Sequence, residues 1–373
     1  MVEPAITALT EQLKKLGNAS SLHSAGRAAR KDLEQAREIT AEAIDCAPSE
    51  VVFTSTGTEA NNLAVKGLYW QGVKSNKKVI ITSTFEHHAV ADPINWLAEH
   101  EGAQVVRIGV DRDGFIDLVE LKEKVSEHKN NVALISIMHS NNEVGTLQDI
   151  DQVVKIAGNI PVHSDCVQSF GKVDLSFNKL GLTAATISAH KIGGPLGVAA
   201  LILKRGLDIE PVLHGGGQER DLRSGTFNVP GIISFAAAAK NAVENRKERE
   251  LKVRELKQEL IETIKKNISD AWVNGNIDKS LPGIVSITFP KTDSEGLLLL
   301  LDGEGIACST GSACSAGVQR PSHVLLAMGL TEDETTSTLR FSLSYTNTIN
   351  EIAKLGSVIA TVVARSKAAS GKK

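Results

Sequence analysis

Cysteine is scarce in this chain, which has 373 residues and only four thiols. They are Cys46, Cys166, Cys308 and Cys314. Thiols so few in so long a chain do not build the framework of a disulfide-rich secreted protein, and none of them forms a Cys-x-x-Cys pair. The adjacent pair His87 and His88 has no acidic or thiol side chain at helical spacing that would complete a ligand set. The sequence therefore predicts neither a disulfide scaffold nor a dedicated metal site.

Aromatic residues, long apolar runs and an excess of one charge are also lacking. Aromatic residues make up 4% of the chain and the formal net charge is -3, which argues against a nucleic-acid-binding surface. The longest apolar runs, 231–239 and 297–301, are too short to span a bilayer. The first residues contain no basic region followed by an apolar one, as a signal peptide would. We therefore expect a cytoplasmic protein that binds neither nucleic acid directly nor membranes.

The first two thirds of the chain alternate between short apolar runs and helical patterns. The expected strands are 51–54, 79–82, 105–108, 132–138, 160–163, 186–188 and 199–203. The expected helices are 59–69, 89–100, 118–128 and 150–157. Strands this apolar, separated by helices, predict a parallel sheet that is covered on both faces. Ligands of such sheets bind at the carboxyl ends of the strands, and the polar motifs described below follow strands.

The pattern changes near residue 245. Leu256, Leu260 and Ile264 recur at helical spacing, which predicts one amphipathic helix from about 236 to 268. Beyond it we expect a smaller α/β domain and a disordered basic tail. Its expected elements are strands near 284–289, 306–309 and 339–343 and helices near 295–301, 322–328 and 350–365, with the tail at 366–373. The predicted division is a large domain over 1–245 and a small one over 246–373.

The segment Ser188–Lys191 is the most informative in the chain. Lys191 follows an expected strand and precedes the Gly/Pro-rich turn 192–197, so its amine can be held at the rim of the sheet. Such an amine can form a Schiff base with an aldehyde cofactor, and pyridoxal phosphate (PLP) is the common one. Taken alone, the motif fits an ordinary surface lysine better. The neighbouring motifs reverse that balance.

Three further motifs follow strands in the first half of the chain. Thr58, in the turn 55–59, offers a hydroxyl and an N–H at a helix N-terminus, where phosphate is favoured, although a plain helix cap would explain it too. His87 could stack on a planar ring or shuttle protons, and an exposed capping histidine is the alternative. Asn142 could hold a ligand oxygen, although Asn141-Asn142 also suits a turn.

The next strand ends near Asp165. A carboxylate there could keep the pyridine nitrogen of PLP protonated, and Gln168 could reach the ring hydroxyl. The Gly-rich stretch 214–226 contains anion-binding residues, although a flexible surface loop is the more common explanation of an isolated Gly run. A solvated aspartate in a loop is the alternative for Asp165.

Two motifs lie in the smaller domain. Cys314 stands among small residues within the predicted loop 308–320, as a thiol on an exposed flexible loop would, whereas Cys308 reads as a packed strand-end thiol. Arg340 lies in an expected strand and could bind a substrate carboxylate in a bidentate way. The alternative for Arg340 is an exposed arginine on an edge strand.

In this order, from the turn at 55–59 to Arg340, the chain resembles the NifS/IscS-like cysteine desulfurases, which belong to the class V aminotransferase group of fold-type I PLP enzymes. The resemblance covers nearly all of residues 1–365. The segments Ser312–Cys314 and Pro321–Leu325 are similar to the long-loop branch that serves general iron–sulfur assembly. The implied fold is a large α/β domain with a mainly parallel, helix-covered sheet and a smaller C-terminal α/β domain.

The resemblance also implies a role for each motif residue. Lys191 would hold PLP covalently, and Asp165 would pair with the pyridinium. The ring would be contacted by His87, Gln168 and Asn142, and the phosphate by Thr58, Ser188, His190 and, from the neighbouring subunit, Thr226. Arg340, with Asn142, would bind the substrate.

The implied reaction converts L-cysteine to L-alanine and leaves a persulfide on Cys314. His87 and Lys191 would serve as catalytic groups, and the persulfide would pass to an iron–sulfur scaffold protein, a tRNA-thiolation enzyme or another acceptor. The implied assembly is a homodimer with shared sites.

Two alternatives stay open. Relatives begin with a short strand and a small-residue segment ahead of the point that matches Val2–Pro4, and we expect the lack of this segment to affect turnover. The chain could therefore be a catalytically impaired binding protein with the PLP fold. It could also be a selenocysteine lyase or another class V enzyme, none of which requires a thiol at Cys314.

Overall fold

The computed structural model describes residues 1–311 and 321–371, which form two compact units. Unit 1 comprises Met1–Ile108, Leu118–His139 and Asp149–Arg246. Unit 2 comprises Gly109–Asp117, Ser140–Gln148 and the described part of Lys247–Lys373. Among the described residues, no helix is both long enough and apolar enough to cross a membrane.

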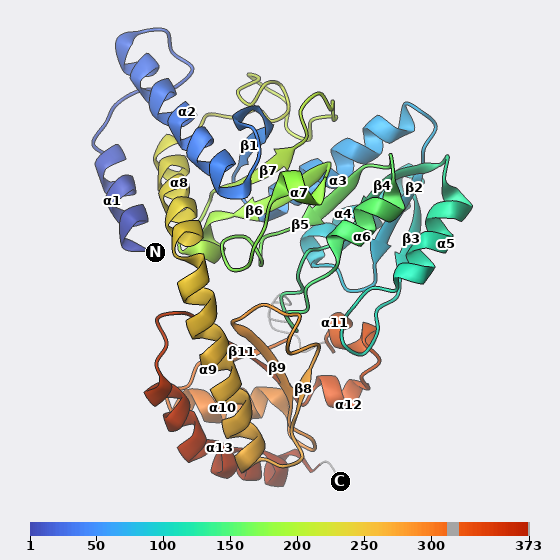
Figure 1. The fold of residues 1–373 in the computed structure, drawn as a ribbon, viewed down its shortest axis with the longest axis vertical. Coiled ribbons are helices and arrows are strands. Elements are labelled where there is room, and N and C mark those ends of the chain that lie inside the picture. Colours follow the sequence, from blue (N-terminus) through green and yellow to red (C-terminus); the bar gives the residue numbers. More distant parts are fainter. Residues whose placement is uncertain (312–320, 372–373) are drawn as a thin grey trace. The chain divides into compact units, whose positions relative to one another are not determined.

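Unit 1 is built on a seven-stranded sheet with the strand order β1-β7-β6-β5-β4-β2-β3 (Figure 1). The strands are β1 (Val51–Thr54), β2 (Val79–Ser83), β3 (Gln104–Ile108), β4 (Val132–Ser136), β5 (Val162–Asp165), β6 (Ala184–Ser188) and β7 (Ala199–Leu203). All seven agree with the sequence-based expectation to within about two residues. The helices are α1 (Glu3–Gln12), α2 (Ser24–Ile44), η1 (Pro48–Glu50), α3 (Gly57–Val73), α4 (His88–Glu101), α5 (Leu118–His128), α6 (Ile150–Ala157), α7 (Phe177–Leu180), η2 (Ala189–Ile192) and α8 (Val229–Glu244).

Strand β7 is the exception to the parallel arrangement. It runs antiparallel to both β6 and β1, so β1 points the same way as the other strands. The connection from β6 to β7 contains only the short turn η2 and a Gly/Pro-rich loop. A parallel return requires a longer crossover, usually with a helix, so this connection reverses the chain.

The core of unit 1 explains why its strands are so apolar. Every residue of β1, β2 and β4 to β7 is buried. Helix α3 contributes Leu63, Ala64 and Leu68 to a cluster that also contains Ile80 of β2 and Leu201 of β7. Because both faces of the central strands are covered, the polar groups of the site are left to the strand ends.

Unit 2 is built on a four-stranded antiparallel sheet with the order β10-β11-β9-β8. The strands are β8 (Trp272–Asn274), β9 (Ile284–Thr288), β10 (Ser309–Thr310) and β11 (Thr338–Ser342). The helices are α9 (Arg246–Asn267), which begins on the last residue of unit 1, α10 (Ser294–Gly303), α11 (His323–Ala327), α12 (Glu332–Thr335) and α13 (Ile349–Ser370). The sequence did not predict β8 or α12.

Two expectations for this region were wrong. The single helix expected over 236–268 is two helices, α8 and α9, separated at Asn245. The tail expected to be disordered from 366 onward continues α13 to Ser370, because Ser366 is buried and its hydroxyl contacts the backbone of Asp293.

The predicted division near residue 245 did not anticipate the two short segments that unit 2 takes from the first half of the chain. Leu147 N donates to Lys279 O at 3.0 Å, and Leu281 N donates to Gly145 O at 2.8 Å. Thr146 Oγ1 donates to Asp113 O at 2.6 Å, which joins the two segments to each other. Asn142 therefore belongs to unit 2.

Candidate active site

The predicted site residues of unit 1 gather at strand ends. Asp165 is the last residue of β5, Ser188 is the last residue of β6, and His190 and Lys191 lie on η2 immediately after it. Strands β1, β2, β5 and β6 point the same way, so their carboxyl ends share one edge of the sheet. The position of Lys191 directly after a buried strand agrees with the sequence prediction.

Asp165 is a buried carboxylate with a donor on each oxygen. Val167 N donates to Oδ1 at 2.9 Å, and Asn61 Nδ2 donates to Oδ2 at 2.7 Å. Burial raises the pKa of Asp165, and these two hydrogen bonds and the charges of His87 and Lys191 partly offset that rise. The carboxylate is thus oriented, desolvated and within the electrostatic reach of two basic side chains.

The N-terminus of α3 lies against the loop that follows β5 and the end of β6. A Cβ added to Gly57 would meet Val167 Cγ2 at 3.1 Å and Ser188 Cβ at 3.7 Å, so only glycine fits there without a shift. Thr56 caps the helix by accepting from Glu59 N at 3.0 Å. The cap is Thr56 rather than Thr58, whose exposed side chain is left for another role. Amide groups of this first helical turn are a favourable site for an anion.

Ser188 and His190 are joined at this end of β6. Ser188 Oγ and His190 Nδ1 lie 2.8 Å apart. Burial lowers the pKa of His190, and the nearby Lys191 and Lys172 lower it further. The structure therefore brings Ser188, His190 and the first turn of α3 to one place, where each can offer a hydrogen bond.

His87 caps the N-terminus of helix α4, and its Nδ1 accepts from Ala89 N at 3.0 Å. The residue before it, Glu86, is buried, and its Oε1 accepts from Ser83 Oγ at 2.5 Å and from Met138 N at 2.9 Å. Burial raises the pKa of Glu86 to about 8, with a further contribution from Asp165. Glu86 thus ties the end of β2 to the end of β4 beside His87.

Gln168 and Thr226 differ in their environments. Gln168 is half-buried, and its Oε1 accepts from Lys172 Nζ at 3.2 Å. Thr226 is exposed on the segment that precedes α8. The family resemblance predicts that Thr226 contacts the phosphate of a second subunit.

The predicted site residues of unit 2 are Asn142 and Arg340. Arg340 lies on β11 and pairs in register with Ser309 of β10, so it is not on an edge strand. Arg340 Nη1 donates to Asn142 O at 2.9 Å, and Arg340 Nε is buried with no hydrogen-bond partner among the described residues. The contact holds the guanidinium in place and leaves a donor for an acidic ligand group.

Cys314 lies outside the described residues. Burial is the main cause that raises the pKa of the Cys46 and Cys166 thiols to about 12 and that of the Cys308 thiol to about 11. These three thiols are therefore almost fully protonated at neutral pH and are poor nucleophiles. Within residues 1–311 and 321–371 no group of three or more His, Cys, Asp or Glu side chains could hold a metal ion.

The profile of one family, described as "Aminotransferase class-V", matches residues 1–355. The chain belongs to the aminotransferase class V family. It is 44% identical over 370 residues to the "IscS-like cysteine desulfurase" of Mycobacterium tuberculosis, covering 98% of this chain and 94% of that protein. It is 40% identical to the "Cysteine desulfurase IscS" of Dictyoglomus turgidum, with coverage of 91% and 85%. A solved structure described as "NIFS-LIKE PROTEIN" superposes with a TM-score of 0.91 at 35% identity over 98% of this chain and 96% of that one.

Class V members of this type depend on PLP, and the described residues fit that cofactor. Asp165 is a buried acceptor whose desolvation a pyridinium N–H would relieve. The first turn of α3, together with Ser188 and His190, supplies donors for a phosphate, and Lys191 supplies the amine. The family resemblance assigns each of these groups to the same part of the cofactor.

Asn61 is a site residue that sequence reasoning missed. It lies one turn into α3, is 1% exposed and donates to Asp165, which is 104 residues away in the chain. The available signal was a polar residue on an otherwise apolar helix face, beside Ala60 and Ala64. That signal does not identify its partner.

We expect Asn61→Leu to weaken PLP binding about tenfold, because a hydrogen bond to a charged group contributes about 1.5–3 kcal/mol and Leu has a similar volume. Equilibrium dialysis of PLP against the purified apoprotein measures the change. Asn95→Leu on α4, where the side chain accepts from Arg107, is the matched control. Equal PLP affinity of Asn61→Leu and the parent would show that the Asp165 contact is dispensable.

Proposed function

We propose that this chain is a PLP-dependent cysteine desulfurase, which converts L-cysteine to L-alanine and passes the sulfur on to acceptor proteins. The observation that carries the proposal is the match to a protein named as a cysteine desulfurase at 44% identity over 98% of this chain. The local geometry supports it, because a lysine, a buried carboxylate and an anion-binding helix start lie together at the strand ends of unit 1.

In this proposal the bound cofactor acts as an electron sink for the substrate Cα. Lys191 holds the cofactor and afterwards moves a proton to or from the substrate Cα through Nζ. Asp165 keeps its negative charge beside the pyridine nitrogen, and Val167 N and Asn61 hold the two carboxylate oxygens in place.

The remaining contacts of the cofactor are assigned by the chemistry of the side chains. Thr58, Ser188 and His190 donate to the phosphate. His87 would contact the ring and exchange protons, and Gln168 and Asn142 would each bind the ring hydroxyl. Support for His87 is that its charge lowers the pKa of Asp165.

Arg340 binds the carboxylate of L-cysteine, with Asn142 as its neighbour. The guanidinium suits this role because Nη1 is held by Asn142 O while Nε has no partner among the described residues. The planar guanidinium presents its donors as a rigid fork, which matches the two oxygens of a carboxylate.

Cys314 is the nucleophile. Its thiolate sulfur forms a bond with the substrate sulfur, and the C–S bond of the substrate breaks, with its electron pair left on the carbon framework. Protonation of that framework yields alanine, and Cys314 carries the persulfide. The raised pKa values of Cys46, Cys166 and Cys308 support this choice, because a thiol with a pKa of about 11 to 12 is almost fully protonated at neutral pH.

The active form is a homodimer in the cytoplasm, in which Thr226 reaches the phosphate of the neighbouring subunit. Thr226 is exposed, as such a contact requires. Four cysteines in a chain of 373 residues do not make a disulfide framework, which supports the location. The sulfur acceptor is an iron–sulfur scaffold protein or another acceptor such as a tRNA-thiolation enzyme.

The proposal is tested by measuring alanine released from L-cysteine by the PLP-loaded protein in the presence of a thiol reductant. We expect release by the parent, release at background level by Cys314→Ser, and normal release by the control Cys46→Ser. Release by Cys314→Ser at the parent rate would refute the persulfide at Cys314. No release by the parent would refute the desulfurase assignment.

A further inference from the structure

The segment 214–226, which we call the Gly-rich segment, is fastened to the rest of unit 1 at two points. The first point joins it to helix α2 and strand β1, and the second joins it to the turn that begins helix α3. The proposed reaction does not use the charged residues that form these two points. Their arrangement suggests that they keep the Glu59 carboxylate from occupying the anion-binding first turn of α3.

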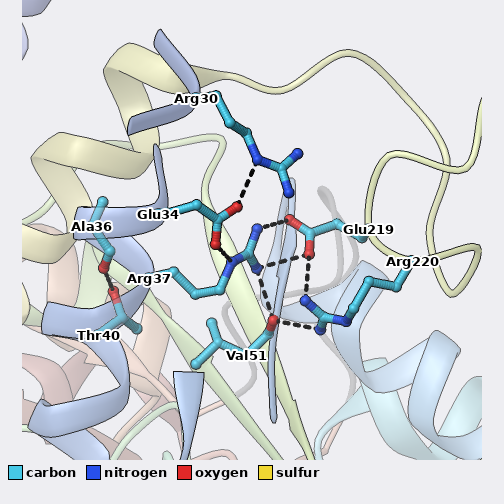
Figure 2. A network of polar contacts seen from close by, with 8 residues as sticks. All are labelled: Arg30, Glu34, Ala36, Arg37, Thr40, Val51, Glu219 and Arg220. Atoms are coloured by element: carbon cyan, nitrogen blue, oxygen red, sulfur yellow. Dashed lines mark hydrogen bonds and ion pairs between the residues drawn. The ribbon is translucent and has the colours of Figure 1, made fainter. Parts of the chain in front are cut away.

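The first point is a buried ion pair between Glu219 and Arg37 of α2 (Figure 2). Arg37 Nη1 donates to Glu219 Oε2 at 2.8 Å, and Nη2 donates to Oε1 at 3.1 Å, which is a bidentate geometry. The side chains are 3% and 0% exposed. Arg37 and Arg220 also both donate to Val51 O, at 2.8 and 2.9 Å, so the segment is fixed to the start of β1.

Between the two points the backbone is strained. Arg220 and Asp221 have φ values of 54° and 62°, a region that non-glycine residues rarely adopt. Such conformations persist where surrounding contacts over-determine them. The contacts here include Glu219 N donating to Arg223 O at 3.1 Å, which closes the turn and directs Arg223 away from the first point.

The second point is the ion pair of Arg223 with Glu59, a first-turn residue of α3. Arg223 Nε donates to Glu59 Oε1 at 2.7 Å, and Nη2 donates to Ser55 Oγ at 2.9 Å. The second carboxylate oxygen, Oε2, accepts from Ser55 N at 2.8 Å. Burial alone would raise the pKa of Glu59, but the hydrogen bonds from Arg223 and Ser55 lower it below its usual value.

This pair matters because Glu59 is an acid inside a turn that is otherwise suited to an anion. The positive end of a helix attracts a glutamate as readily as it attracts a phosphate. Glu59 and Arg223 are only 19% and 15% exposed, so solvent screens their charges weakly. An unpaired Glu59 carboxylate would both repel a bound phosphate and compete for the same amide groups.

We propose that Arg223 is a positioning residue for the cofactor phosphate: its ion pair compensates the charge of Glu59 and holds that carboxylate on Arg223 and Ser55 N instead of on the amide groups of the first turn of α3. The inference rests on the proposed function, since it takes the phosphate of PLP as the anion at this turn. The Gly-rich segment then positions Arg223 beside Glu59, and the Arg37–Glu219 ion pair fixes this segment to helix α2.

The test is a double-mutant cycle on PLP affinity, measured by equilibrium dialysis with the apoprotein. Arg223→Gln should weaken PLP binding about tenfold, because it leaves a negative charge beside a phosphate dianion. Glu59→Gln in the same chain removes that charge, so Arg223→Gln/Glu59→Gln should bind within about threefold of the parent.

Arg246→Gln is the matched control, because Arg246 is also 15% exposed and pairs with Asp174 at 2.9 Å. It should leave PLP affinity unchanged. Equal losses of PLP affinity in Arg223→Gln and in the double variant would overturn the inference, and so would no loss in either variant. In both cases PLP binding by the parent would still support the proposed function. Failure of the parent to bind PLP would refute both.

Discussion

Lys191→Ala should lower alanine formation from L-cysteine by at least about 10³-fold, because a lost covalent anchor and proton carrier together exceed the usual contribution of one acid–base group. The position of the residue supports so large an effect. Lys191 lies on η2, directly after a strand that is buried along its whole length, so its main chain has little freedom to move. Neighbouring side chains cannot take its place without a change in that backbone.

The measurement for Lys191→Ala has two parts. Alanine release gives the rate, and borohydride reduction followed by mass spectrometry shows whether PLP is attached to the chain. Lys204→Ala is the matched control, because Lys204 follows β7, which runs antiparallel to β6, and so it lies at the opposite end of that strand pair. Turnover of Lys191→Ala within tenfold of the parent would exclude Lys191 as the anchor.

Removal of one partner of the Arg37–Glu219 pair should lower the free energy of unfolding of the apoprotein by about 3–5 kcal/mol, the usual effect of leaving a buried charge without its partner. Burial alone would lower the pKa of Arg37, and Glu219 and Glu34 together raise it above its usual value instead. An arginine side chain is effectively always protonated in proteins, so the guanidinium stays charged in Glu219→Leu. The buried guanidinium would then lack the Glu219 carboxylate that accepts hydrogen bonds from both its Nη1 and its Nη2.

The double variant Arg37→Met/Glu219→Leu separates the charge effect from packing. Replacing a buried ion pair by apolar residues of similar volume is often neutral or stabilising, so the double variant should be more stable than Glu219→Leu. Urea denaturation followed by circular dichroism measures all three proteins. A double variant as unstable as Glu219→Leu would mean that the pair acts through shape and not through its charges.

Most of the site was predictable because its residues directly follow strands. The runs 79–82 and 186–188 are continuous apolar stretches, and local pattern is enough to identify them as strands. The polar residues after such runs reach the strand ends by geometry alone. For this reason Asp165 and Lys191 could be assigned to one edge of the sheet before the structure was known.

The partners of those residues were not predictable in the same way. Asn61 and Asp165 are 104 residues apart, and Arg37 and Glu219 are 182 apart. Sequence pattern carries no information about which distant side chains meet, because packing of the whole unit brings them together. Asn61 and Arg37 consequently looked like ordinary helix residues.

The sequence by itself determined the positions of the strands of unit 1, the order of its polar motifs and the resemblance to cysteine desulfurases. The tertiary structure alone decided the reversed direction of β7, the break between α8 and α9, and the assignment of Asn142 to unit 2 beside Arg340. The physical reason is the range of the interactions. Burial periodicity and strand propensity act over a few neighbouring residues, whereas strand direction, unit membership and ion pairing depend on contacts that form only when distant segments pack.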